Sequence, residues 1–182
     1  SNTSPHLWIL GSSNYGAQLA AHLGLPYAFA YFFSDGVGVE QALDIYRSQF
    51  RPSPFLSQPQ ATICVSALVC DTEAEAAFQF QTRARWRIDR NKGLAGPLLP
   101  PDEAVAGLSP AQLQEVQALG AQALIGTPTQ VNAKLRALAT SLSLEELVVC
   151  SWTHDPAVQL RSFELLAQAF NMTHQQGFKQ AA

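Results

Sequence analysis

The alternation of short apolar runs with segments of helical periodicity constrains the fold of this chain more than any other feature. Four runs are apolar on both alternating faces and are bounded by turn residues, which is typical of buried parallel strands: 7–10, 27–33, 61–70 and 147–152. Between these runs, apolar residues recur at three- and four-residue steps. Because consecutive parallel strands require right-handed helical crossovers, the sequence predicts an α/β fold with a parallel sheet.

Capping residues predict where several helices begin and end. A helix over 17–23 should stop at Gly24, since glycine accepts the left-handed conformation of a C-cap, and the apolar stripe within 39–50 predicts a second helix. Asp155 should open the last long helix. Other helices should start where a side-chain oxygen precedes a Glu or Gln that can close a capping box: Thr72 with Glu75, Ser109 with Gln112, and Thr127 with Gln130. The stretch 91–108, rich in glycine and proline, is predicted to be a mobile loop.

The length and composition limit how much of a fold this chain can supply. Its 182 residues, 47% of them hydrophobic and 14% charged, are expected to bury a sizeable core and to form a single domain over 1–182. A closed eight-stranded barrel takes roughly 250 residues and rarely fewer than about 200. Because this chain has only four predicted β/α units, its sheet is either open or part of a barrel.

The charge balance gives no reason to expect nucleic acid or a membrane as a partner. The chain carries 14 acidic and 11 basic side chains, for a formal charge of −3. It has no apolar run of the roughly 18 residues that a membrane helix needs, and no signal-peptide pattern at its start, so a cytoplasmic location is expected. Cys64, Cys70 and Cys150 lie in apolar runs rather than in C-x-x-C pairs, so we interpret them as reduced core residues and expect no metal site.

One segment of the chain carries a chemical signal. Residues 7–17, LWILGSSNYGA, run from an apolar strand through small polar residues into a helix. The first N–H groups of a helix are unpaired and carry about half a positive charge, so an anion placed there gains about 0.3 to 2 kcal/mol. The simpler alternative is that Ser13 or Asn14 only caps this helix.

The composition of this turn suits a phosphate group. Ser12 and Ser13 add hydroxyl donors, and Gly11 and Gly16 permit a close approach to the backbone. No acidic residue occurs between 7 and 31, so nothing in the segment repels a dianion. The pattern is neither a dinucleotide-binding G-x-G-x-x-G fingerprint nor a P-loop, because the lysine of a P-loop is missing.

Four segments of the chain together carry a family pattern. In chain order they are WILGSSNYGAQLAAHLGLPYAFAYFF, EQALDIYRSQFRPSP, IGTPTQVNAKLRALATSLSLEELVV and HDPAVQLRSFELLAQAF. These segments resemble the C-terminal half of the bacterial luciferase-like, flavin-dependent monooxygenases. The resemblance implies four β/α units that form half of a TIM-type (β/α)8 barrel, with the N-terminal half absent. It also implies an FMN-dependent oxidoreductase that uses O2 and reduced FMN, supplied by a separate flavin reductase, to oxidise a small organic substrate.

The same resemblance assigns a cofactor-binding site. The family's phosphate-binding turn falls on Ser12 and Ser13, and the backbone N–H groups of Asn14, Tyr15 and Gly16 complete it. The FMN phosphate is therefore expected at the turn that the residues themselves suggest. The resemblance assigns no catalytic residue.

The absent half leaves two arrangements open. The strands at 7–10 and 147–152 would be left as unpaired edges, which invite pairing with another chain. Two copies could associate as a dimer, or the chain could be a piece of a longer enzyme. The alternative function is a non-catalytic flavin-binding or scaffold protein that assembles from such half-barrels.

Three further groups of residues have both a functional and a structural interpretation. His154 follows the last strand, where a general base or flavin contact could lie, or it is an ordinary turn residue. Tyr15 and Trp8 could stack on the flavin ring or belong to the core. A basic cluster surrounds Trp86 and comprises Arg83, Arg85, Arg87, Arg90 and Lys92. This cluster could bind an anion or nucleic acid, although a solvated helix face with buried aromatic residues is the favoured interpretation.

Overall fold

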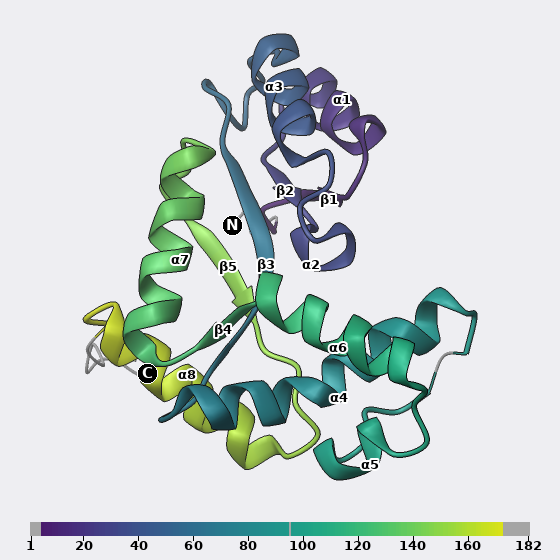
Figure 1. The fold of residues 1–182 in the computed structure, drawn as a ribbon. Coiled ribbons are helices and arrows are strands. Elements are labelled where there is room, and N and C mark those ends of the chain that lie inside the picture. Colours follow the sequence, from purple (N-terminus) through teal and green to yellow (C-terminus); the bar gives the residue numbers. More distant parts are fainter. Residues whose placement is uncertain (1–4, 95, 173–182) are drawn as a thin grey trace, which may run out of the picture. The chain divides into compact units, whose positions relative to one another are not determined.

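A computed structural model of the chain describes residues 5–94 and 96–172 (Figure 1). These residues form two compact units. The first unit contains the residues up to 66 together with 136–150, and the second contains 67–135 and the residues from 151 onward. No helix in the described ranges is long and apolar enough to cross a membrane.

The first unit is a parallel sheet covered by helices. Its strands are β1 (Ile9–Gly11), β2 (Tyr27–Phe29), the first six residues of β3 (Ala61–Val69) and β5 (Leu147–Cys150). Each strand pairs with the next in that order, with Ile9 opposite Tyr27, Tyr27 opposite Ala61, and Ile63 opposite Leu147. The helices are α1 (Asn14–Leu23), α2 (Tyr31–Ser34), α3 (Val39–Gln49) and the end of α7 (Pro128–Ser141). Figure 1 shows α1 and α3 side by side.

Two tyrosines organise the core of this unit. The rings of Tyr27 and Tyr46 are fully buried, with their centroids 5.4 Å apart. The Tyr46 hydroxyl donates to the carbonyl of Leu25 and accepts from the N–H of Gln60, both at 3.0 Å. Burying a phenol without a partner is costly, so this pair of bonds fixes the start of β3 against α3.

The second unit packs helices around the end of β3. Residues 67–69 of that strand pair in parallel with β4 (Leu124–Gly126). The helices are α4 (Glu73–Asn91), α5 (Pro101–Val105), α6 (Pro110–Gln122), the start of α7, and α8 (Pro156–Ala169). Figure 1 shows α4 and α6 side by side. The buried core of the unit consists of Leu68, Cys70, Ala76, Phe80, Ala84, Ile88 and Val116.

The helix starts predicted from capping residues are confirmed by their hydrogen bonds, whereas the helix predicted over 17–23 begins earlier, at Asn14. The Thr72 hydroxyl accepts from the N–H of Glu75 at 3.1 Å, and Asp155 accepts from the N–H of Ala157 at 2.8 Å. Ser109 and Gln112 form a reciprocal capping box. The predicted C-cap is also confirmed, since Gly24 lies in the left-handed region with φ 63°.

Several predicted boundaries are wrong. The strand predicted over 27–33 ends at Phe29, because Ala30 leaves the extended region and residues 31–34 form α2. The strands predicted over 7–10, 61–70 and 147–152 occupy 9–11, 61–69 and 147–150. The predicted loop 91–108 contains α5, which starts with Pro101 at its first position and has Asp102 and Glu103 in its first turn. β4 was not predicted, because three residues are too few to show a periodicity.

One face of the sheet in the first unit is open. In the described part of the chain, β1 pairs only with β2 and β5 only with β3, so each has an unpaired edge. Leu10 on β1 is 58% exposed and Val148 on β5 is 44% exposed, and the register places both on the same face. An exposed apolar sheet face with free edges is the surface that further strands would cover.

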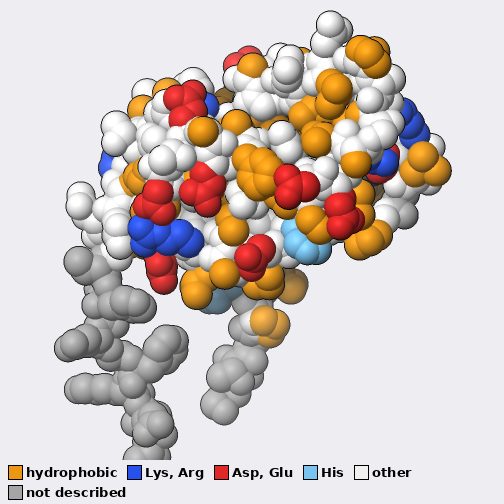
Figure 2. Space-filling view, turned by 60° about the horizontal axis from the view of Figure 1, so that its bottom comes forward, with side chains coloured by type: hydrophobic (Ala, Val, Ile, Leu, Met, Phe, Trp, Pro, Cys, Tyr) orange, Lys and Arg blue, Asp and Glu red, His pale blue; other side chains and the backbone are white. Residues whose placement is uncertain are grey.

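The surface carries charges of both signs. On the part of the face visible in Figure 2, acidic, basic and hydrophobic side chains are interspersed, without a continuous basic area. This agrees with the formal charge of −3 for the whole chain.

Candidate functional site

The turn between β1 and α1 exposes its two serines. Ser12 and Ser13 are exposed, and Ser13 is the N-cap residue of α1 with extended backbone angles (φ −139°, ψ 164°). The Ser13 side chain makes no capping hydrogen bond, and neither serine hydroxyl bonds to another described residue. The hydroxyls are therefore available to a ligand, and the alternative in which the Ser13 side chain only caps the helix does not describe this structure.

The backbone of the turn offers further donors. Asn14, Tyr15 and Gly16 are the first three residues of α1, and N–H groups at these positions have no acceptor within their own helix. No backbone hydrogen bond joins them to the rest of the described chain. The first turn of α1 contains no acidic residue, so no carboxylate competes for the positive end of the helix. The turn combines exposed hydroxyls, free N–H groups and a helix dipole, which is the chemistry that binds a phosphate.

The buried Tyr27 contacts the backbone of this turn from the core side. The Tyr27 hydroxyl lies 3.5 Å from the carbonyl oxygens of both Gly11 and Ser13, so its single proton is shared in a long, two-acceptor contact. Burial raises the pKa of the Tyr27 phenol to about 12, so the phenol stays a donor at neutral pH. In a trans peptide the C=O and the following N–H point in opposite directions. Carbonyls turned toward Tyr27 therefore turn the N–H groups of Ser12 and Asn14 away from the core.

Gly11 and Gly16 lie close to each other and to Tyr27 in this turn. A Cβ on Gly11 would lie 3.6 Å from the Cα of Gly16, and a Cβ on Gly16 would lie 3.6 Å from the ring of Tyr27. A methyl group at either position would therefore make ordinary van der Waals contact with the other glycine or with the tyrosine ring. The sequence indicated the two glycines but not Tyr27, whose only signal was a hydroxyl-bearing ring inside an apolar strand.

The two aromatic candidates lie in different places. Tyr15 is 72% exposed on the first turn of α1, so its interpretation as a core residue is wrong. Trp8 precedes β1 and lines a cavity of about 280 Å³ with Arg47 and Gln60, at the N-terminal ends of the strands. The turn at residues 12–16 follows the C-terminal end of β1, so Trp8 is not part of that turn.

His154 lies in the turn that precedes α8, and its ring is held by the backbone. Its Nδ1 lies 2.8 Å from the carbonyl oxygen of Leu98. A carbonyl oxygen only accepts, so Nδ1 is the donor in this contact. A role as a general base stays a prediction.

Two arginines of the basic cluster pack on tryptophans, while Lys92 is exposed. The guanidinium of Arg83 lies 5.9 Å from the ring centroid of Trp152, and that of Arg90 lies 5.6 Å from Trp86. The two indole rings meet edge to face with centroids 4.7 Å apart. Arg85 instead pairs with Asp89 at 2.7 Å. The favoured interpretation was a solvated helix face with buried aromatic residues. It is wrong in that the arginines are not fully solvated and Trp86 and Trp152 are not fully buried, because all of these side chains are half-buried.

The three cysteines are free thiols, and they differ in burial. Cys70 is buried in the second unit, and burial, with Glu75 and Asp71 nearby, raises its pKa to about 11. Cys64 and Cys150 are only half-buried neighbours in the first unit, and burial, followed by the proximity of Cys150, raises the pKa of Cys64 to about 11. The assignment of all three to the core is thus correct only for Cys70. Cys64 and Cys70 remain protonated near neutral pH and are weak nucleophiles.

Known proteins are similar to this chain in sequence and in fold. The family model described as luciferase-like monooxygenase matches residues 1–145. A protein described as luciferase-like monooxygenase from Escherichia coli (strain K12) is 36% identical over 160 residues, which are 87% of this chain and 48% of that protein. The chain spans about half the length of the curated relatives it matches.

Solved structures match over nearly the whole chain. The crystal structure of apo-MsnO8 is similar with a TM-score of 0.82 and 34% identity, over 95% of this chain and 53% of that one. The long-chain alkane monooxygenase LadA is similar with a TM-score of 0.59 over 93% of this chain and 41% of that one, and at 13% identity this shows the fold alone. The predicted fold class, parallel β/α units that make up about half of a TIM-type barrel, is confirmed.

Proposed function

Because this chain belongs to the luciferase-like monooxygenase family, we propose that it forms the C-terminal half of a flavin-dependent monooxygenase and holds the phosphate of reduced FMN at residues 12–16. The proposal includes a small organic substrate, O2, a separate flavin reductase as the source of reduced FMN, and a cytoplasmic location. When bound, the flavin would supply the redox chemistry, and the chain's own residues would bind and orient it.

The observation that carries this proposal is that the turn has several hydrogen-bond donors without an acceptor in the described chain. Ser12 and Ser13 present hydroxyls without partners, and the N–H groups of Asn14, Tyr15 and Gly16 have no acceptor in the described chain. FMN differs from riboflavin by a phosphate that is a dianion near neutral pH. Hydrogen bonds to a charged group contribute about 1.5 to 3 kcal/mol each, so this turn can hold the flavin by its phosphate alone.

The unpaired edges of β1 and β5 support the proposal that the chain works as part of a larger barrel. They leave Leu10 and Val148 on an open sheet face, and the relatives are about twice as long as the chain. We therefore propose that residues 1–182 act as one domain only when an N-terminal half completes the sheet.

A direct test compares FMN with riboflavin. The protein to use is a hybrid in which the N-terminal half of the Escherichia coli relative precedes these 182 residues. We expect FMN to bind about 100-fold more tightly than riboflavin, a difference of about 2.7 kcal/mol, in a fluorescence titration. Equal affinities for the two flavins would exclude the phosphate site.

The free edges also favour a second candidate, a non-catalytic half-barrel that pairs with a second copy of itself. This candidate predicts a dimer of the 182-residue chain in light scattering, and no substrate-dependent consumption of O2 when reduced FMN is added. The monooxygenase proposal predicts such consumption in the hybrid.

Replacing Tyr27 with phenylalanine should weaken the binding of FMN about fivefold and leave riboflavin unaffected. The variant removes the proton that both turn carbonyls share, which is a neutral hydrogen bond of about 1 kcal/mol. Tyr46→Phe is the control, because it removes both 3.0 Å hydrogen bonds of the Tyr46 hydroxyl in the same core without touching the turn. If both variants change the ratio of FMN to riboflavin affinity equally, Tyr27 does not orient the turn.

A further inference from the structure

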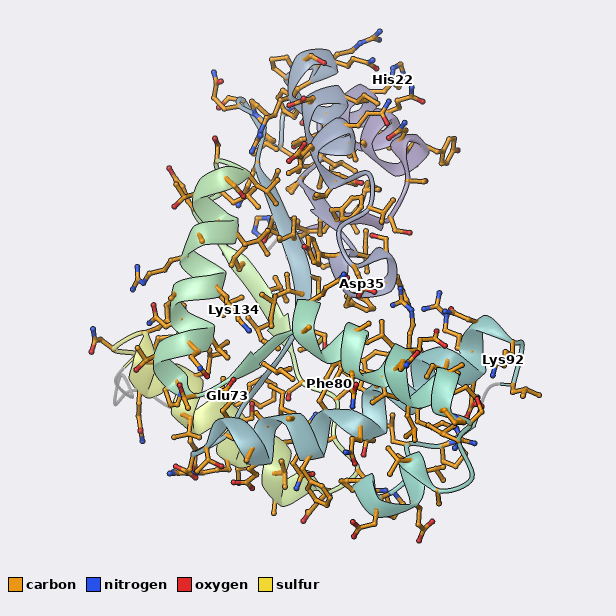
Figure 3. The ribbon with its side chains drawn as sticks, viewed as in Figure 1. His22, Asp35, Glu73, Phe80, Lys92 and Lys134 are labelled. Atoms are coloured by element: carbon orange, nitrogen blue, oxygen red, sulfur yellow. The ribbon has the colours of Figure 1, made fainter. Side chains whose placement is uncertain are left out.

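A cavity of about 390 Å³ lies in the second unit, between α4, α6, β4 and α7. Figure 3 labels three of its lining residues: Glu73 and Phe80 on α4, and Lys134 on α7. A volume of this size is within the usual range for sites that take small molecules. Residues 12–16 do not line this cavity, so a ligand bound here is independent of the proposed FMN site.

The floor of this cavity is apolar and belongs to the core. Phe80 is 5% exposed and Val116 is 8% exposed, and Ile125 of β4 lies beside them. Gly120 on α6 faces Phe80, and a Cβ there would lie 3.7 Å from the ring. The missing side chain at Gly120 thus leaves room next to the phenylalanine.

Two opposite charges line the same cavity without pairing with each other. Lys134 Nζ donates to the carbonyl oxygens of Ala123 at 3.2 Å and Ile125 at 3.0 Å, which fixes the ammonium and leaves its third N–H free. Glu73 Oε2 accepts from Gln130 Nε2 at 3.2 Å, and its other oxygen has no partner in the described chain. No ion pair joins Glu73 to Lys134 in the described structure.

Two side-chain amides offer further hydrogen-bond donors and acceptors to a ligand. Gln81 on α4 and Gln117 on α6 also line the cavity, and neither makes a side-chain hydrogen bond within the described chain. Around an apolar floor, the cavity therefore offers one carboxylate oxygen, one ammonium proton and two amides. This set is complementary to a small molecule that carries one positive charge, one negative charge and an apolar group.

We propose that this cavity binds a small zwitterion with an apolar substituent, of the class of an apolar α-amino acid. The ligand's ammonium lies at Glu73, its carboxylate lies at Lys134, and its side chain packs on Ala77 and Phe80. A singly charged ligand makes only one of the two charge contacts, with Glu73 or with Lys134, so it binds more weakly.

The test uses the 182-residue chain and three related probes in calorimetric titrations. L-phenylalanine carries both charges, 3-phenylpropionate lacks the ammonium, and phenethylamine lacks the carboxylate. We expect L-phenylalanine to bind about tenfold more tightly than either of the others. The absence of binding at millimolar L-phenylalanine, or equal affinities for all three probes, would overturn the proposal.

Three variants assign the charges to their residues. Glu73→Gln should remove the preference for L-phenylalanine over 3-phenylpropionate, and Lys134→Met should remove the preference over phenethylamine. Ala77→Phe should abolish binding, because the larger side chain fills the cavity while both charges stay in place. Ala77 is an exposed helix residue, and such positions usually tolerate substitution. Full L-phenylalanine affinity in Ala77→Phe, with a circular dichroism spectrum like that of the unchanged chain, would place the ligand elsewhere and contradict the proposal.

Discussion

Replacing Ser13 with aspartate is expected to stabilise the chain by about 1 kcal/mol and to weaken FMN binding more than 100-fold. Ser13 is the N-cap of α1, yet its side chain makes no capping bond. An aspartate there gains the missing bond and the attraction of the helix dipole. The same carboxylate stands where the phosphate would bind and repels it.

Ser13→Asp should raise the stability of the chain while it lowers the affinity for FMN. General damage to the fold would lower both, so the two effects together distinguish the prediction from such damage. The free energy of unfolding comes from urea denaturation of the 182-residue chain, and FMN affinity from titration of the hybrid barrel. Ser13→Asn is the control, because asparagine caps a helix equally well without a charge, and it should lower the affinity less than tenfold. An aspartate variant that keeps FMN affinity within tenfold of the original would show that the phosphate does not bind at this turn.

The features that the sequence predicted correctly depend on neighbouring residues. The caps at Thr72, Ser109 and Asp155 each involve partners two or three positions away, so the pattern alone identifies them. The turn at 12–16 was located for the same reason, because a strand passes directly into a helix there. Its role in binding FMN stays a prediction.

The features that the sequence did not reveal depend on distant contacts. The Tyr27 hydroxyl reaches Gly11 and Ser13 only because β1 and β2 pair side by side, and its strand pattern gave no sign of that role. The cavity in the second unit joins Glu73 and Lys134, which are far apart in the chain and have no motif in common. Packing of α4 against α6 and β4 creates that site, and no local pattern encodes it.

Replacing Gly24 with alanine should lower the free energy of unfolding by at least about 3 kcal/mol. Gly24 ends α1 in the left-handed region, with φ 63°, which costs an alanine about 1 to 2 kcal/mol. A Cβ at this position would also lie 2.5 Å from the carbonyl oxygen of Arg51 and 2.6 Å from the Cβ of Ser53. Relieving these overlaps requires the backbone to move, which would break the 2.8 Å bond from the Ser53 hydroxyl to the Gly24 carbonyl.

Gly38→Ala separates the conformational cost from the steric one. Gly38 also has a positive φ, 81°, at the N-cap of α3, but a Cβ there would meet nothing within 4 Å. This variant should lose only about 1 to 2 kcal/mol in the same urea denaturation, because it carries the strain without the overlap. Equal losses in the two variants would mean that the segment 51–53 yields to the new methyl group, and that α1 is held by its helical contacts rather than by the close approach at Gly24.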